Sequence, residues 1–363
     1  MTMHDGTRMT VLEQAIEKGA CAVMTAPASV LKGGHGPRQV MLSAFTTLGV
    51  GGPAELWVCH NFEELREATI EPYRILGGGS NLIVGDEGVR ERVIRLAGEF
   101  SAANLEIESE RDAPDGQTQV TTGWVGAAKG IPRLLRQLQE RGLSGLEGLV
   151  GVPAVIGGSV RMNAGTRFGW MDAALECVEV FVDGEARVYA PSELGFAYRQ
   201  SKIPHGKLGA GIVTRVKLKL KRSNPKAVQH EMNRADEARK GQPHQRTFGC
   251  AWKNPSGESA GKLVDQAGLK GARIGGAMIS LEHGNFLVNA GNATAHDVLA
   301  LLSQIEYTVG VPLEREVEIW NTEPLDSDQT PGATGLRSLE PDSDGPDLNG
   351  PESRGRTTEG GMG

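Results

Sequence analysis

The chain has 363 residues, a formal charge of −7 and 39% hydrophobic residues, which is enough for two or three domains with a buried core. The acidic balance argues against binding to duplex nucleic acid, because the one basic cluster, Lys217, Lys219, Lys221 and Arg222, has the spacing of the solvent face of a strand. No apolar run of about 18 residues and no apolar signal-peptide core occurs. We therefore expect no membrane span and a cytoplasmic protein with reduced thiols.

The two ends of the chain are predicted to be peripheral. The first 38 residues contain a short amphipathic pattern over 11–20 and a turn-rich connector over 32–39. After about residue 322 the chain is poor in apolar residues and rich in Gly, Pro, Asp and Ser. Such a composition cannot bury enough surface to offset the entropy of ordering, so we expect a disordered tail over 323–363.

Between these ends, helix and strand patterns alternate, which indicates an α+β fold with three subdomains. Strands are expected at 54–59, from 73 onward, at 93–96, as a hairpin over 177–190, at 212–221 and near 311–320. Helices are expected at 61–70, 131–143, about 225–240 and 294–305. Asn61 with Glu64, and Thr294 with Asp297, have the spacing of helix N-caps. Asp183-Gly184 is a turn signal between two β-rich runs.

No C-x-x-C pair occurs among the four cysteines (Cys21, Cys59, Cys177 and Cys250), and the eight histidines show neither H-x-H nor H-E-x-x-H spacing. Metal sites usually show one of these spacings, so we predict no metal site. Glycine is frequent, at 50 residues. Its clusters indicate tight turns and places where the backbone lies close to a ligand.

Two glycine-rich stretches are candidates for cofactor binding. LGGGSNLIV at 76–84 follows a strand, and its N–H groups can form a concave nest for phosphate oxygens; an ordinary glycine turn is the alternative. GLEGLVGVPAVIGGSVRMNAG at 145–165 has glycines at close intervals, which favours backbone lying along a large flat ligand such as a dinucleotide. A set of crowded β-turns is the alternative there.

Three further stretches carry candidate chemistry. In FAYRQSKIP at 196–204, Arg199 has the chemistry to hold a carboxylate with two hydrogen bonds, or it is a surface arginine. In FGCAWKNP at 248–255, Lys253 and Asn254 follow Cys250 closely enough to face one polar substrate, or Cys250 is a buried, inert thiol. In LEREVEIW at 313–320, alternating glutamates are expected to share one strand face, where they are solvated or supply a site acid. These glutamates are Glu314, Glu316 and Glu318.

In this order, the stretches resemble the UDP-N-acetylenolpyruvoylglucosamine reductases, which are flavoenzymes of bacterial peptidoglycan synthesis. The resemblance covers about residues 40–320. Single pieces are weak signals, but eight in sequence are specific. They are TTLGVGGPAELWV, LGGGSNLIVGDEGV, GLEGLVGVPAVIGGSVRMNAG, FAYRQSKIP, FGCAWKNP, SAGKLVDQAGLKGARIGGAMIS, HGNFLVN and GVPLEREV. The C-terminal pieces are similar to the shorter subtype, which lacks an extra tyrosine-bearing loop near the substrate.

The resemblance implies an α+β fold in which a two-lobe FAD-binding domain of the vanillyl-alcohol-oxidase type is followed by a C-terminal α+β substrate-binding domain. We accordingly divide the chain into an N-terminal extension (1–38), a first FAD-binding lobe (39–98), a second lobe (99–222), a substrate-binding domain (223–322) and the tail (323–363). We expect a monomer that binds neither nucleic acid nor a membrane.

The resemblance also implies roles for single residues. Arg199 and Glu316 would face the carboxylate of UDP-N-acetylglucosamine enolpyruvate, and Cys250 stands where the family usually has a serine that protonates the substrate carbon. Tyr198, Lys253 and Asn254 would bind substrate. FAD would lie on Gly77, Gly78, Gly79, Ser80, Asn81, Gly151, Val152, Gly157, Gly158, Ser159, Asn163, Ala164 and Gly165. NADPH would be the reducing co-substrate, and the product would be UDP-N-acetylmuramate.

Two positions depart from the family pattern. Pro153-Ala154 replaces Pro-Gly, which puts a methyl group near the flavin or shifts the loop. Cys250 replaces serine; because a thiol has a pKa of about 8.5, it is a stronger acid than an alcohol. We predict that Cys250 is a protonated general acid at neutral pH. A protonated Glu316 could donate a hydrogen bond to the substrate carboxylate, for which burial must raise its pKa.

Two other functions are alternatives. One is a different FAD-dependent oxidase or dehydrogenase of the same fold that acts on a sugar. The other is a non-catalytic protein that binds a nucleotide sugar, against which the joint presence of Arg199, Cys250 and Glu316 argues. No obvious His or Cys flavin-attachment motif occurs, which favours non-covalent FAD.

Overall fold

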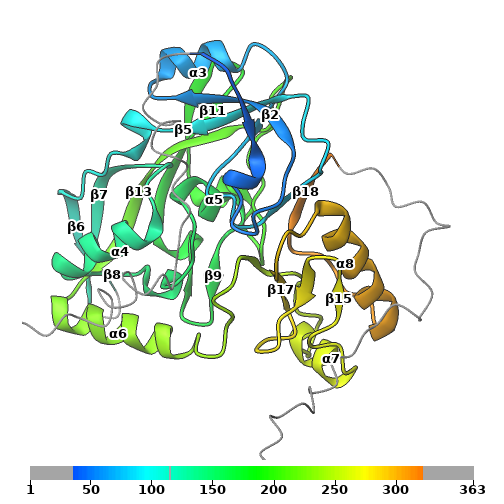
Figure 1. The fold of residues 1–363 in the computed structure, drawn as a ribbon. Coiled ribbons are helices and arrows are strands. Elements are labelled where there is room, and N and C mark those ends of the chain that lie inside the picture. Colours follow the sequence, from blue (N-terminus) through cyan, green and yellow to red (C-terminus); the bar gives the residue numbers. More distant parts are fainter. Residues whose placement is uncertain (1–35, 114–115, 322–363) are drawn as a thin grey trace, which may run out of the picture.

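The structure, a computed structural model, describes residues 36–113 and 116–321 and is shown in Figure 1. The helix expected at 11–20 and the tail expected at 323–363 lie outside the described residues, as does the first part of the connector at 32–39. The described chain forms two sheet-based lobes and a C-terminal α+β part that lies beside them.

The first lobe contains a four-stranded sheet in the order β1-β2-β5-β3. β1 runs antiparallel to β2, whereas β2, β5 and β3 run parallel. The elements are β1 (Arg38–Met41), η1 (Leu42–Ala44), β2 (Pro53–Cys59), α3 (Phe62–Ala68), β3 (Tyr73–Ile75), β4 (Leu82–Val84), β5 (Arg92–Leu96) and η2 (Gly98–Ser101). Asn61 caps α3 as expected, because its side-chain oxygen accepts the backbone N–H of Glu64 at 2.9 Å.

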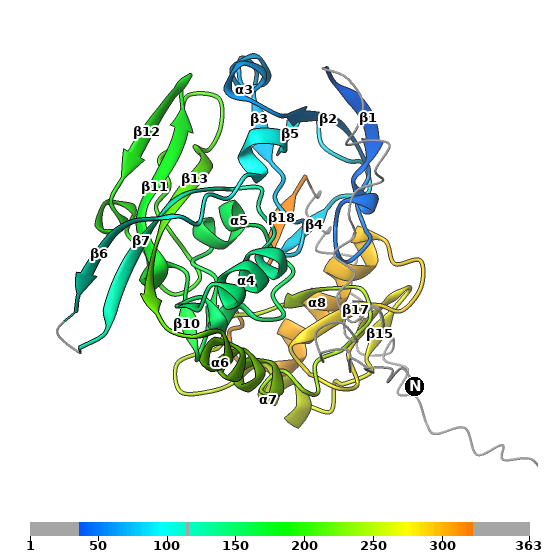
Figure 2. The same cartoon turned by 90° about the vertical axis from the view of Figure 1, so that its left-hand side faces the viewer.

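The second lobe contains an antiparallel sheet in the order β12-β11-β13-β7-β6, with β8 paired to β13. Figure 2 shows α4 and α5 on the side of this sheet that faces the rest of the molecule. The elements are β6 (Ile107–Asp112), β7 (Thr118–Gly126), α4 (Ile131–Glu140), β8 (Leu143–Ser144), η3 (Glu147–Leu149), α5 (Ile156–Arg161), β9 (Gly165–Thr166), β10 (Gly169–Trp170), η4 (Asp172–Ala174), β11 (Leu175–Val182), β12 (Glu185–Tyr189), η5 (Pro191–Leu194), β13 (Ile212–Arg222) and α6 (Pro225–Glu237).

The core of the second lobe lies between this sheet and its helices. The apolar side of α4 is buried together with the inward side chains of β13, because the helix repeats its apolar residues every three to four positions and the strand every two. α6 buries Val228, Met232 and Ala235 in the same core. The predicted domain division, with a boundary at 223, stays a proposal; α6 itself packs with the second lobe.

The C-terminal part contains a four-stranded sheet in the order β14-β17-β16-β15. Its elements are β14 (Thr247–Cys250), α7 (Ala260–Gln266), β15 (Arg273–Ile274), β16 (Ala277–Ile279), β17 (Phe286–Asn289) and α8 (Ala295–Val309). The chain then returns to the first lobe as β18 (Glu318–Trp320), which pairs in parallel with β4.

A second contact joins the C-terminal part to the first lobe. The carboxylate of Asp86, which follows β4, accepts the backbone N–H groups of Ala295 and His296 at 2.9 and 3.1 Å. These N–H groups belong to the first turn of α8, where helices favour a carboxylate. The first lobe and the C-terminal part are therefore attached both by a strand pair and by a helix cap.

Most predicted elements are confirmed within a few residues. Asp183 and Gly184 have φ of +49° and +84°, which suits the two central positions of a type I′ hairpin turn. Thr294 caps α8 with Asp297 as expected, and the helix runs to Val309, four residues beyond the predicted end. Within the described ranges, no helix has the length and apolarity needed to cross a bilayer.

Candidate active site

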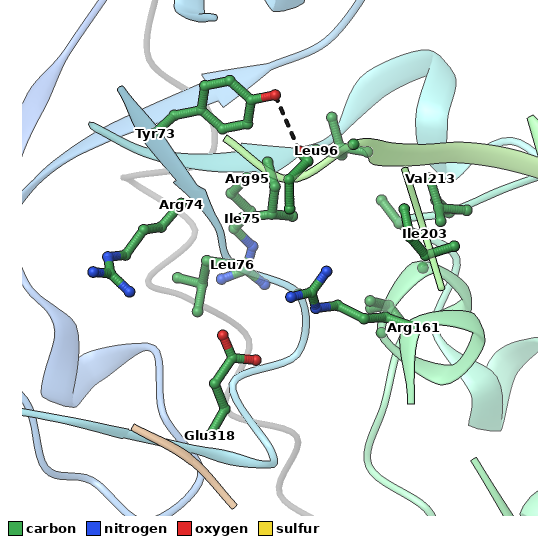
Figure 3. Close-up of a pocket in the computed structure, with 18 of the residues that line it drawn as sticks. Tyr73, Arg74, Ile75, Leu76, Arg95, Leu96, Arg161, Ile203, Val213 and Glu318 are labelled. Atoms are coloured by element: carbon green, nitrogen blue, oxygen red, sulfur yellow. Dashed lines mark hydrogen bonds between the residues drawn. The ribbon is translucent and has the colours of Figure 1, made fainter. Parts of the chain in front are cut away.

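A cavity of about 390 Å³ lies between the first and second lobes and is shown in Figure 3. The first lobe contributes β3, Gly77 and Arg95 to its lining, and the second lobe contributes Gly157, Gly158 and Arg161. Apolar side chains cover the rest of the wall, among them Ile75, Leu76, Leu96, Val155, Ile203 and Val213. The cavity thus joins apolar walls, glycine backbone and three arginines, Arg74, Arg95 and Arg161, in one place.

The glycines of the loop after β3 are required by close backbone approaches. A Cβ on Gly78 would lie 3.1 Å from the Pro153 carbonyl oxygen, and a Cβ on Gly79 would lie 2.0 Å from the Phe45 carbonyl oxygen. Gly79 also has φ of +63°, a conformation that L side chains disfavour. Of the loop residues predicted to hold FAD, Gly77 lines the cavity, whereas Gly78, Gly79, Ser80 and Asn81 follow beside it.

The second glycine stretch also lies partly in the cavity lining and partly outside it. Gly157 and Gly158 line the cavity, while Ser159, Asn163 and Ala164 are buried behind them. Asn163 has φ of +44°, and its side chain bonds the Ala197 carbonyl and the Asp172 N–H. Its observed contacts hold the loop in shape. Gly151 and Val152 lie outside the lining, and the Gly151 carbonyl accepts Arg239 Nη2 at 3.0 Å.

The cavity fits the dinucleotide that the sequence predicts. Gly77 and Gly158 lie side by side in its wall, because a Cβ on Gly77 would lie 3.9 Å from the Gly158 Cα and 3.4 Å from the Val155 side chain. The backbones of the two glycine stretches therefore meet at the cavity. Backbone N–H groups and guanidinium groups are suitable donors for phosphate oxygens, and the apolar wall is suitable for aromatic rings.

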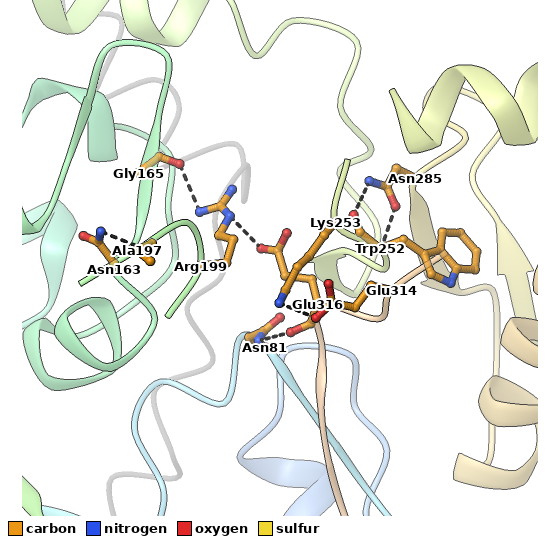
Figure 4. A network of polar contacts seen from close by, with 10 residues as sticks. All are labelled: Asn81, Asn163, Gly165, Ala197, Arg199, Trp252, Lys253, Asn285, Glu314 and Glu316. Carbon is orange, nitrogen blue, oxygen red and sulfur yellow. Dashed lines mark hydrogen bonds and ion pairs between the residues drawn. The ribbon is translucent and has the colours of Figure 1, made fainter. Parts of the chain in front are cut away.

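A second group of residues, Arg199, Glu316 and Cys250, comes from two parts of the fold, and Figure 4 shows Arg199 and Glu316 facing each other. Arg199 Nε lies 3.0 Å from Glu316 Oε1, and the two side chains are 20% and 9% exposed. Arg199 Nη1 also donates to the Gly165 carbonyl at 3.0 Å. The Nε–H is not aligned with the carboxylate, so this buried donor has no hydrogen-bond acceptor among the described residues. The pair is close but incompletely bonded.

Arg199 is also held in an unusual conformation. Its φ is +58°, in the left-handed region that non-glycine residues rarely adopt and that often marks functional sites. Its guanidinium carbon lies 5.4 Å from the Trp170 ring centre and 5.7 Å from that of Tyr198. The two rings are 5.5 Å apart, edge to face. The three centres form a nearly equilateral triangle, so both rings lie on one side of the guanidinium and together restrict where it can point.

Burial raises the pKa of Cys250 to about 11, and the negative charge of Glu316 contributes in the same direction. The positive charges of Arg199 and Arg239 act in the opposite direction and are weaker. Burial also raises the pKa of Glu316, while Arg199 and Lys253 partly offset this. Cys250 is therefore a thiol at neutral pH, as the sequence analysis expected, and Glu316 keeps a proton to higher pH than an exposed carboxylate.

Backbone hydrogen bonds hold Cys250 and Glu316 near each other. The Glu316 N–H donates to the Ala251 carbonyl, and the Lys253 N–H donates to the Glu314 carbonyl, both at 2.8 Å. Asn81, which belongs to the glycine loop after β3, bonds the backbone of Glu316, because its side-chain Nδ2 donates to the Glu316 carbonyl at 3.1 Å. The glycine loop and the glutamate are thus positioned together.

The remaining predicted residues lie around this group with different partners. Lys253 Nζ pairs with Glu314 Oε1 at 2.6 Å, and its charge reaches Glu316. The Asn254 side-chain oxygen accepts the Ala260 N–H at the start of α7, so that oxygen is engaged within the protein. Tyr198, 45% exposed, lies beside Arg199.

The expectation that Glu314, Glu316 and Glu318 share one strand face is wrong. Only Glu318 lies in β18, and the segment before it is irregular. Glu314 is exposed and pairs with Lys253, Glu316 is buried beside Arg199, and Glu318 lines the cavity. Irregular backbone removes the period of two on which the expectation rested.

Sequence reasoning missed Arg95, Arg161, Trp170 and Arg239. Two of them carried a usable signal: Arg161 follows directly after the Gly157-Gly158-Ser159 turn, and Arg95 is a charge within an otherwise apolar strand. No local pattern links Trp170 or Arg239 to the site, because their positions depend on tertiary packing.

Comparisons with known proteins agree on one family. The model of the UDP-N-acetylenolpyruvoylglucosamine reductase C-terminal domain matches residues 242–320. UDP-N-acetylenolpyruvoylglucosamine reductase of Thermus thermophilus is 55% identical over 282 residues, covering 78% of this chain and 98% of the relative. That of Deinococcus radiodurans is 54% identical and covers 78% and 95%. The crystal structure of the Thermus caldophilus reductase matches with a TM-score of 0.72 and 54% identity, covering 79% of this chain and 100% of that one.

Proposed function

The chain belongs to the UDP-N-acetylenolpyruvoylglucosamine reductase family, and we propose that Arg199, Glu316 and Cys250 bind the enolpyruvyl ether of a UDP-sugar and protonate it, while bound FAD supplies the hydride for its reduction. The chain is an oxidoreductase of peptidoglycan precursor synthesis, since relatives of this name match it at 54–55% identity over nearly their whole length. The substrate is accordingly UDP-N-acetylglucosamine enolpyruvate and the product UDP-N-acetylmuramate.

One observation carries the residue assignment: a guanidinium, a carboxyl group with a raised pKa and a protonated thiol meet where the second lobe faces the C-terminal part. Each group has a separate chemical task in reducing an enol ether conjugated to a carboxylate. The tasks are to hold the carboxylate, to stabilise the charge that develops on it and to protonate the adjacent carbon.

Arg199 would hold the substrate carboxylate. Its Nε–H has no acceptor in the described chain, and a carboxylate placed there would complete its hydrogen bonds. Negative charge spreads onto this carboxylate as the double bond is reduced. A fixed positive group beside it stabilises charge that is greatest in the transition state, which accelerates the reaction.

Glu316 would face the same carboxylate from the C-terminal side. Two carboxylates cannot lie side by side unless one carries a proton or a cation lies between them. Because burial raises the pKa of Glu316, its protonated form can donate a hydrogen bond to the substrate. Asn81 and Ala251 fix the backbone of Glu316 and thereby the direction of the side chain.

Cys250 Sγ would give its proton to the substrate carbon that bears the ether oxygen. The raised pKa keeps the proton on sulfur until the carbanion-like carbon is formed. The family's usual serine, an even weaker acid, would need more help from its neighbours. Lys253 and Tyr198 lie close enough to this group to contact other parts of the UDP-sugar.

The cavity between the lobes would hold FAD, along Gly77, Gly157 and Gly158. A bound FAD, reduced by NADPH, supplies the hydride chemistry that no amino-acid side chain provides. The monomeric state expected from the sequence stays a prediction. The cytoplasmic location expected from the sequence stays a prediction.

A stopped-flow experiment tests the proposal. Purified protein is mixed anaerobically with NADPH, and flavin absorbance is followed; UDP-N-acetylglucosamine enolpyruvate is then added. We expect bleaching by NADPH and rapid recovery of colour with the enolpyruvyl sugar. Recovery with oxygen or a simple sugar but not with the enolpyruvyl sugar would contradict the proposal and favour an oxidase of the same fold.

A further inference from the structure

Two guanidinium groups enter the cavity between the lobes from opposite sides. Arg95 comes from β5 of the first lobe, and Arg161 comes from the C-terminal end of α5 in the second lobe. Figure 3 shows their guanidinium groups pointing toward one another above Leu76. Like charges that converge in a partly apolar cavity repel each other, and an anion bound between them would relieve this repulsion.

Neither guanidinium has an acidic partner within residues 36–113 and 116–321. The one contact of the Arg95 guanidinium there is the Phe45 ring, 5.6 Å from its carbon, and its pKa is lowered because burial disfavours the charged form. The Arg161 side chain makes no ion pair or hydrogen bond in that part of the chain. An unpaired guanidinium that is as buried as that of Arg95 is costly and is usually explained by a ligand, whereas the Arg161 side chain is exposed and reaches the cavity from solvent.

A third arginine in the same cavity shows the contrasting arrangement. Arg74 also lines the wall, but its Nε and Nη2 bond Glu91 Oε1 at 3.1 and 2.7 Å, and Nη2 also donates to Asn321. Glu318, the other carboxylate near the cavity, accepts Trp320 Nε1 at 2.9 Å. The protein therefore neutralises Arg74 with its own acid and leaves Arg95 and Arg161 without one.

We propose that Arg95 and Arg161 bind a diphosphate ester between the two lobes and that this diphosphate is that of the flavin dinucleotide. A diphosphate carries two negative charges and several acceptor oxygens, which match two opposed guanidinium groups. Gly77, Gly157 and Gly158 line the same cavity, and a Cβ on Gly158 would meet no atom within 4 Å. This inference rests on the proposed function and assigns a role to two cavity arginines for which the sequence analysis made no prediction.

The UDP part of the substrate is the other possible source of a diphosphate. The dinucleotide is favoured because Arg199, Cys250 and Glu316 are absent from the cavity lining, so a diphosphate bound there lies apart from the reacting end of the sugar. A diphosphate held by one arginine from each lobe would also draw the lobes together. FAD would then stabilise the closed arrangement of the two lobes as well as react.

The test compares flavins with and without the diphosphate. Full-length protein freed of flavin is titrated with FAD, riboflavin and UDP, following flavin fluorescence or, for UDP, heat. The variants are Arg161→Ala, whose side chain is exposed, and Arg95→Gln; Arg74→Ala is the matched control in the same cavity. We expect FAD affinity to fall about 10- to 100-fold in each of the first two, the scale of a charge-assisted hydrogen bond, and riboflavin affinity to change less than about threefold.

Arg74→Ala should leave the ratio of FAD to riboflavin affinity unchanged, because its charge is already paired. An unchanged ratio in Arg161→Ala, or an equal loss for both flavins, would overturn the inference while leaving the reductase function intact. Weaker UDP affinity with unchanged FAD affinity would assign the diphosphate to the substrate and also overturn it. Wild-type protein that binds no flavin would instead contradict the proposed function.

Discussion

Residues 315 and 316 are neighbours in the chain, yet each forms an arginine–glutamate pair of a different kind. Arg315 donates to both oxygens of Glu306, at 2.6 and 2.8 Å, and to Ser303 Oγ at 3.0 Å. Glu306 also accepts Trp252 Nε1 at 2.8 Å. Every group in this first pair is bonded, within the C-terminal part.

The second pair, Glu316 with Arg199, joins the C-terminal part to the second lobe and is incomplete. The carboxylate and guanidinium are 3.0 Å apart, but the Nε–H lacks an aligned acceptor. Arg199 has a left-handed backbone, and the pKa of Glu316 is raised. The difference teaches that the complete pair holds the chain in place, while the incomplete pair leaves bonding capacity for a ligand.

The largest effect is expected at the thiol beside the incomplete pair. Cys250→Ala should lower turnover on the order of 10²–10⁴-fold, because it removes the general acid, while reduction of the flavin by NADPH stays fast. Cys250→Ser should keep appreciable activity. Steady-state turnover and stopped-flow reduction measure the two effects, with Cys177→Ala as the control. Normal turnover in Cys250→Ala would show that the proton comes from elsewhere.

Removing the arginine of the incomplete pair comes next. Arg199→Ala should lower turnover on the order of 10²–10³-fold, the scale of losing one preorganised charge-stabilising donor. It should change the free energy of unfolding by less than about 1 kcal/mol, since only an incompletely bonded ion pair is lost and alanine leaves the left-handed backbone of residue 199 as strained as before. Activity assays and urea unfolding of the same preparation separate the effects. A large loss of stability would make the pair structural.

The reactivity of the thiol probes the charges around it. With a pKa of about 11 instead of 9.0, Cys250 has about 100-fold less thiolate at pH 8 than an ordinary cysteine. Its alkylation by iodoacetamide, followed by mass spectrometry, should be slower by that factor and should accelerate as pH rises toward 11. Activity that needs the protonated thiol should persist above pH 9 and fall as pH passes about 11.

Variants that remove a charge near Cys250 should change its rate of alkylation in opposite directions. Glu316→Gln removes a negative charge that raises the Cys250 pKa, so alkylation should become faster. Arg199→Ala removes a positive charge that lowers it, so alkylation should become slower. Equal alkylation rates in the wild type and both variants would mean that the charges of Glu316 and Arg199 do not affect the pKa of Cys250.

The smallest effect on activity is expected at the complete pair. Arg315→Ala should reduce the free energy of unfolding by about 1–3 kcal/mol, because it leaves Glu306 without its guanidinium partner in a half-buried position. Turnover should fall only several-fold, through looser positioning of Glu316. Urea unfolding with and without FAD, beside activity assays, measures both. If Arg315→Ala lost as much activity as Arg199→Ala, the proposed difference between the Arg315–Glu306 and Arg199–Glu316 pairs would be wrong.

Much of the fold follows from short-range signals. The caps at Asn61 and Thr294 and the turn at Asp183-Gly184 were predictable because each depends on a few neighbouring residues. The glutamates at 314, 316 and 318 were predicted wrongly, because their segment is irregular and each carboxylate takes its direction from a distant partner. The resemblance proposed Arg199, Cys250 and Glu316 as the catalytic residues; in the structure Arg199 and Glu316 are 3.0 Å apart, and the charges of both act on the pKa of Cys250.

By itself the sequence determined the strands, the helices and the glycine turns, since periodicity and capping act over a few residues. It also determined that a thiol stands at position 250, and with it the kind of acid available. The tertiary structure alone decided which arginines remain unpaired, how far burial moves the pKa values of Cys250 and Glu316, and which of two adjacent residues serves the site. Charge, unlike periodicity, depends on neighbours in space, and these are set only when the two lobes and the C-terminal part pack together.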